Sequence, residues 1–115
     1  MQMSREAFEE VVGEALDQVP QELLDMLENV VFLVEDESDH AGEELLGLYE
    51  GVPRTERSEW GGAVLPDRIT IYRLPTLRVC SSEQEVRDEV AITVVHEIAH
   101  HYGIGERRLH ELGWG

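Results

Sequence analysis

The spacing of apolar residues predicts two helices at the start of the chain. Ser4 suits the N-cap of the first helix, because its hydroxyl can accept from an early backbone amide. After it, apolar residues recur three or four positions apart, at Ala7, Phe8, Val11, Val12, Ala15, Leu16 and Val19. Pro20 interrupts this spacing and fits the first turn of a second, short helix. The apolar side of that helix is formed by Leu23, Leu24, Met26 and Leu27.

Three shorter apolar runs are typical of strands. Val30–Val34 is β-branched and aromatic, and too short for a helix, which predicts a buried strand. A second short strand is expected around Leu46–Tyr49, inside a stretch that glycine and proline otherwise mark as a long loop. Arg68–Leu74 alternates, with Ile69 and Ile71 on one face. This third run could be an edge strand that pairs with a peptide, or a strand that only fills the core.

A longer helix is predicted near the end of the chain. Ser81 or Ser82 can cap it, with Glu85 completing a capping box. An apolar line then follows at every fourth position, Val86, Val90, Val94 and Ile98. We expect this helix to run to about Tyr102 and to end at Gly103.

A last short helix, Glu106–Leu112, would close the chain. With the N-terminal helices and a sheet of two or three strands, the order of elements predicts an α+β fold.

Composition and charge narrow the class of protein. The length of 115 residues predicts a single domain, residues 1–115. A formal net charge of −16, from 25 Asp plus Glu against 9 Lys plus Arg, argues against nucleic acid as a partner. Cys80 is the one cysteine, so it reads as a small apolar residue. Neither a signal peptide nor a membrane-spanning segment is visible, and the expected location is cytoplasmic.

The stretch HEIAHHYGIGE, from His96 to Glu106, carries the candidate chemistry. Positions four apart on a helix differ by only about 40 degrees in direction, so His96 and His100 can bind one Zn²⁺. Glu97 is rotated away from that line, where it can hydrogen-bond a water on the metal. The spacing H-E-x-x-H therefore predicts a zinc-activated water with Glu97 as general acid/base.

A catalytic zinc also needs a third protein ligand and one open position. Gly103 lets the helix stop, and Glu106 follows three residues later with a carboxylate that can approach from a new direction. His110, about one helical turn beyond Glu106, is the alternative third ligand. His101 also competes, although it points about 100 degrees away from His100.

These residues resemble a known family. HEIAHHYGIGERRLHELGW, together with LLGLYEGVPRTERS and PDRITIYR, is similar to the small bacterial zincin-like metallopeptidases, the minimal zincins, over Leu45 to Trp114. The resemblance implies a minimal zincin-like domain with Zn²⁺ held by His96 and His100 and with Glu97 as the catalytic residue. Glu106 stands where the aspartate or histidine of longer zincins would stand.

The leading hypothesis is a zinc-dependent metallopeptidase that acts on a peptide or protein substrate, with no membrane or nucleic-acid partner. Two other interpretations stay open. One is a metal-binding regulatory or interaction module without peptidase activity, and the other is a structural domain whose histidines bind nothing. The sequence indicates neither a particular substrate nor an oligomeric state.

Overall fold

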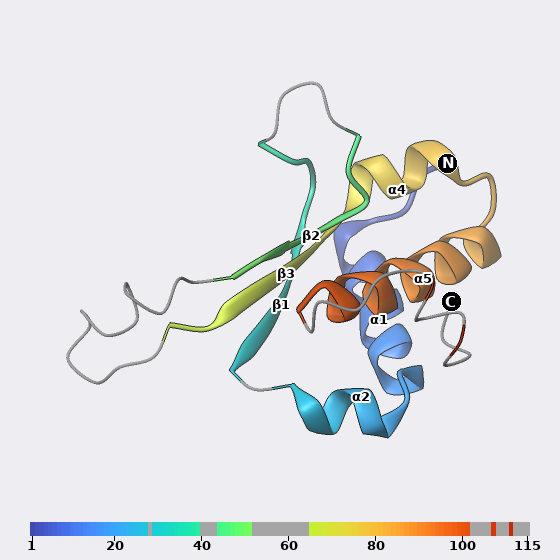
Figure 1. Ribbon diagram of the computed structural model, residues 1–115. Coiled ribbons are helices and arrows are strands. Elements are labelled where there is room, and N and C mark those ends of the chain that lie inside the picture. The colour runs from blue at the N-terminus through green and yellow to red at the C-terminus, as the bar shows by residue number, and fades with distance from the viewer. Residues whose placement is uncertain (28, 40–43, 52–64, 102–106, 108–110, 112–115) are drawn as a thin grey trace.

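The computed structural model describes residues 1–27, 29–39, 44–51, 65–101, 107 and 111. This part of the chain forms four helices and a three-stranded sheet, which confirms the predicted α+β class (Figure 1). In chain order the elements are α1 (Arg5–Gln18), α2 (Gln21–Met26), β1 (Val30–Glu35), β2 (Gly47–Glu50), β3 (Asp67–Tyr72), α4 (Arg73–Val79) and α5 (Glu83–His101). The expected terminal helix, Glu106–Leu112, lies largely outside the described residues.

The sheet is mixed, with β3 in the middle. The strand order is β1-β3-β2, in which β1 runs parallel and β2 antiparallel to β3. The Cα register pairs Phe32 and Tyr49 with Ile69 from opposite sides. The possibility that Arg68–Leu74 is an edge strand is therefore wrong, because β3 has a neighbour on each side. Among the described strands, β1 and β2 are the edges.

The sequence predicts a buried strand at Val30–Val34, but no side chain of β1 is fully buried. Side chains of β1 alternate between intermediate and exposed, and Val31 and Leu33 are each 37% exposed. An edge strand packed on one face buries every second side chain, whereas a central strand can bury both sets. The apolar composition of β1 thus predicts the strand correctly, but the prediction that the strand is buried is wrong.

The core lies between the sheet and the two long helices. Helices α1 and α5 lie on the same side of the sheet, with α5 packed against β2, β3 and α1 (Figure 1). The predicted line of α5 is fully buried, since Val86, Val90, Val94 and Ile98 each have 0% exposure. They pack with residues of α1, α2 and β3, among them Phe8, Val11, Val12, Leu23, Ile69 and Ile71.

The predicted helix caps of α1 and α5 are present. Ser4 Oγ accepts from the Ala7 amide at 3.1 Å, and Ser82 Oγ accepts from the Glu85 amide at 3.1 Å. The Glu85 carboxylate in turn accepts from the backbone amide and hydroxyl of Ser81. These hydrogen bonds, the amide first, lower the pKa of Glu85. Local side-chain chemistry therefore determines where both long helices begin.

Helix α4 is a feature that the sequence pattern does not predict. The strand ends at Tyr72 rather than Leu74, and Arg73–Val79 is helical. Pro75 sits in the first turn of this helix, where a missing amide costs nothing, and Thr76 Oγ1 donates to the Tyr72 carbonyl at 2.7 Å. The alternating pattern of β3 continues into α4 and conceals this boundary.

Cys80 lies in the core, as its apolar character predicts. Cys80 is 6% exposed, and its burial, followed by the nearby carboxylates of Glu89 and Glu85, raises the pKa of its thiol. This agrees with its expected role as a small apolar residue. Within the described residues, no helix has the length and apolar character needed to cross a lipid bilayer.

Candidate metal centre

The last two turns of α5 carry the histidine cluster. This part of the helix is anchored by Ile98 and Ala99, which are 0% and 1% exposed. On the remaining faces, His96 is half-buried and the side chain of His100 is 62% exposed. Their spacing of four positions stacks the two imidazoles along one side of the helix. Both rings can therefore be reached from outside the core.

Glu97 lies between this accessible side and the sheet. It is 8% exposed, and its stem packs under β2, since a Cβ placed on Gly47 would lie 3.1 Å from Glu97 Cγ. Its carboxylate lies beside His100, with Glu97 Oε1 3.2 Å from His100 Nδ1. A buried stem holds the carboxylate in one place and leaves it few rotamers.

His96 and His100 could bind a divalent metal ion, because both are imidazole donors and both can be reached from solvent. Imidazole nitrogen is a common zinc donor, and the contact with Glu97 engages Nδ1 of His100, so that Nε2 is the atom left for a metal. Within the described part of the chain, no group of three His, Cys, Asp or Glu residues is placed to hold a metal. The candidate third ligands, Glu106 and His110, and the expected helix end at Gly103 fall outside the described residues.

His101, the third candidate, faces the sheet. Its Nδ1 lies 3.2 Å from Asp67 Oδ2, and its side chain is 13% exposed. Tyr49 of β2 donates to the same Asp67 oxygen at 3.0 Å, and the rings of Tyr49 and His101 are 5.3 Å apart. The end of α5 thus packs against β2 and β3 directly after His100.

Sequence reasoning missed Asp67 and Tyr49. Both lie on strands more than thirty residues before His101, and neither forms a motif with it. The sheet register brings them together, because Tyr49 of β2 lies opposite Ile69 of β3, and Asp67 is two residues before Ile69 on the same strand.

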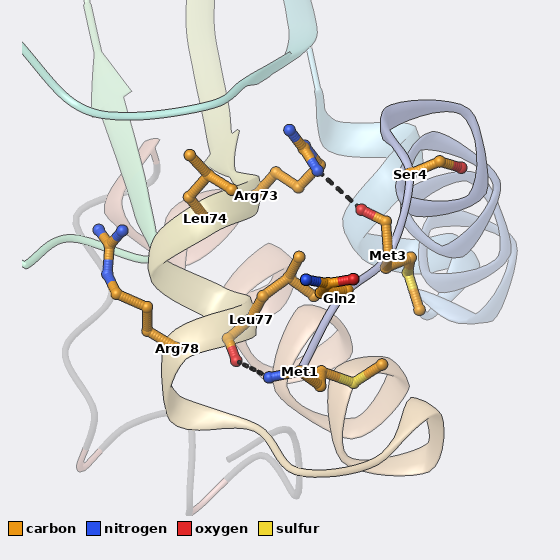
Figure 2. Close-up of a pocket in the computed structure, with 8 residues that line it drawn as sticks. All are labelled: Met1, Gln2, Met3, Ser4, Arg73, Leu74, Leu77 and Arg78. Atoms are coloured by element: carbon orange, nitrogen blue, oxygen red, sulfur yellow. Dashed lines mark hydrogen bonds between the residues drawn. The ribbon is translucent and has the colours of Figure 1, made fainter.

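A pocket of about 520 Å³ lies elsewhere, between the N-terminal segment and α4 (Figure 2). Its two guanidinium groups are engaged: Arg73 donates to the Met3 carbonyl and to Asp36, and Arg78 pairs with Glu37 and Glu44. The pocket holds no histidine or carboxylate among its described lining residues.

Comparisons with known proteins identify a family and a solved structure that are similar to this chain. The sequence profile of a family described as zincin-like metallopeptidase matches residues 27–114. The solved structure of a conserved hypothetical protein from Thermus thermophilus is 26% identical and superposes with a TM-score of 0.58. That alignment covers 87% of this chain and 94% of the other. A search of curated proteins found no significant match.

Proposed function

Because the chain belongs to the zincin-like metallopeptidase family, we propose that it is a zinc-dependent hydrolase of peptide bonds. The family implies a metal, typically zinc, and His96 and His100 are the residues that would hold it. Glu106 is the proposed third ligand, with His110 as the alternative. The observation that carries the proposal is the position of the Glu97 carboxylate, 3.2 Å from the His100 ring on an otherwise accessible helix face.

The chemistry divides between the metal and Glu97. A bound zinc ion would supply a Lewis acid that polarises the scissile carbonyl and lowers the pKa of water. Glu97 accepts the proton of the attacking water and then returns it to the amide nitrogen as the C–N bond breaks. The packing of its stem under Gly47 keeps this carboxylate oriented between the two transfers.

The proposed substrate-binding element is β2. Its outer edge is unpaired among the described strands, and the strand packs directly on Glu97. An extended peptide that adds to this edge would pass close to the carboxylate. We therefore propose that the substrate is a peptide or protein segment that binds in an extended conformation.

Metal binding is the first test. We expect one zinc per chain by elemental analysis, with loss of the metal in His96→Ala and in His100→Ala. Glu106→Ala should weaken zinc binding by at least about tenfold, a loss of about 1.4 kcal/mol, and His110→Ala should leave it unchanged. The reverse result would assign the third ligand to His110. Full zinc binding by both histidine variants would contradict the proposal.

Hydrolysis is the second test. Glu97→Gln keeps the size of the side chain but removes the base, so hydrolysis of a peptide library should fall by about 10²- to 10⁴-fold while zinc stays bound. Glu83→Gln, an exposed position in the first turn of the same helix, is the matched control and should retain full activity. A zinc-loaded wild-type protein without any hydrolysis would instead indicate a metal-binding module.

A further inference from the structure

The outer edge of β1 presents backbone groups that no other described strand pairs with. The Asp67 amide of β3 donates to the Asn29 carbonyl. In this parallel pair, the backbone amides and carbonyls of every second residue of β1 after Asn29, namely Val31, Leu33 and Glu35, therefore point toward β3. Val30, Phe32 and Val34 therefore direct their amides and carbonyls toward the outer edge. Arg5 donates to the Val34 carbonyl at one end of this edge, which supports the assignment. Apart from Arg5, no described residue forms a hydrogen bond with these outward backbone groups.

A groove of about 400 Å³ runs beside this edge, between β1 and α1. Its lining is mostly apolar, with Val12, Leu16, Phe32, Leu33 and Val34 among the lining residues. A strand added to β1 would direct every second side chain into this groove.

Gly13 opens the groove at its middle. It lies inside α1, where glycine costs roughly 0.5–1 kcal/mol relative to alanine. A Cβ on Gly13 would meet nothing within 4 Å, so packing inside the chain does not require the glycine. The missing side chain leaves space that another molecule can enter.

The charge around the groove is negative. Glu9 and Glu35 line it, and Glu6, Glu10 and Asp17 are exposed on α1. Of the lining residues, Arg5 is the basic one, and it already pairs with Glu9 at 3.1 Å. A second copy of the chain would bring the same acids and another net charge of −16 to the interface. Charge complementarity therefore favours a cationic occupant.

We propose that the β1 edge and the Gly13 groove bind an extended segment of a partner protein. The segment adds as a strand to Val30–Val34, places apolar side chains over Gly13 and Leu16, and directs Lys or Arg toward Glu9 and Glu35. This site uses the sheet edge opposite to β2, and it does not depend on the peptidase proposal.

The test is selection from a displayed library of random peptides about ten residues long. We expect the enriched peptides to combine apolar residues with Lys or Arg. Gly13→Leu, which fills the groove, should weaken their binding by at least about tenfold, and Gln18→Leu, an exposed position on the same helix outside the groove, should not. Both variants keep the net charge, so the comparison separates groove binding from general attraction to an acidic surface.

Hydrogen exchange provides the second readout. Bound peptide should slow exchange of the Val30, Phe32 and Val34 amides, as strand addition requires. Leucine is a better helix former than glycine, so Gly13→Leu should be at least as stable as wild type. The absence of enriched peptides, or equal binding by Gly13→Leu, would overturn the proposal. A wild-type dimer that Gly13→Leu converts to a monomer would also overturn it, by assigning the groove to a second copy.

Discussion

At the scale of single residues, Gly47 controls how closely β2 approaches α5. A Cβ at this position would lie 2.6 Å from Thr93 Cγ2 and 3.1 Å from Glu97 Cγ. Thr93 cannot easily turn away, because its hydroxyl donates to the Glu89 carbonyl at 2.8 Å. The absence of one methyl group therefore sets the position of the proposed catalytic carboxylate.

Gly47→Ala should move Glu97 or separate β2 from α5. We expect a loss of about 1–3 kcal/mol in the free energy of unfolding, which is typical of an overpacked site. The rate of peptide hydrolysis should fall with it, because a displaced carboxylate no longer meets the water. Urea denaturation and kcat/KM measure the two effects.

The matched control is Gly13→Ala, at the position where a Cβ meets nothing within 4 Å. That variant should be more stable by roughly 0.5–1 kcal/mol, since alanine is the better helix former. If Gly47→Ala matched wild type in both measurements, the close approach would have no functional meaning.

At the scale of elements, α5 is positioned from three sides. Its apolar line is buried in the core, and the Ser82 cap determines its beginning. At its end, His101 Nδ1 lies 3.2 Å from Asp67 Oδ2. The same Asp67 oxygen accepts from Tyr49 of β2. The residue next to His100 thus packs against two strands, and this packing should orient the metal-binding face.

Asp67→Asn should loosen the end of α5 while preserving the size of the side chain. We expect zinc affinity to fall by roughly tenfold, the lower end of what groups that orient metal ligands contribute, because Asp67 acts on His100 only through its neighbour His101. Competition with a chelator measures the affinity independently of overall stability. Tyr49→Phe, which removes one hydroxyl and keeps the ring beside His101, should have the smaller effect. If zinc affinity were unchanged in Asp67→Asn, the contact between Asp67 and His101 would have no effect on metal binding.

At the scale of the whole molecule, acidic residues far outnumber their partners. Arg5, Arg68, Arg73, Arg78 and Arg87 each pair with a carboxylate. With 25 acidic against 9 basic residues, most of the negative charge must still face solvent or a partner. The sheet is covered by α1 and α5 on one side and has two free edges in the described part. Both proposed binding events use these edges, β2 for substrate and β1 for a basic segment.

Features that depend on neighbours along the chain could be predicted from the sequence. The caps at Ser4 and Ser82 and the buried line of α5 are local, because hydrogen bonds and helical periodicity involve residues three or four apart. The spacing of His96, Glu97 and His100 is local for the same reason, so the proposed metal-binding pair could be identified without coordinates.

Features that depend on which strands pair were decided only by the tertiary structure. An apolar strand has the same composition at an edge as in the centre, so the half-exposed state of β1 required the order β1-β3-β2. Asp67 and Tyr49 reach His101 through the sheet register, and Gly47 meets Glu97 because β2 packs on α5. Such contacts join residues far apart in the chain, and no local pattern encodes them.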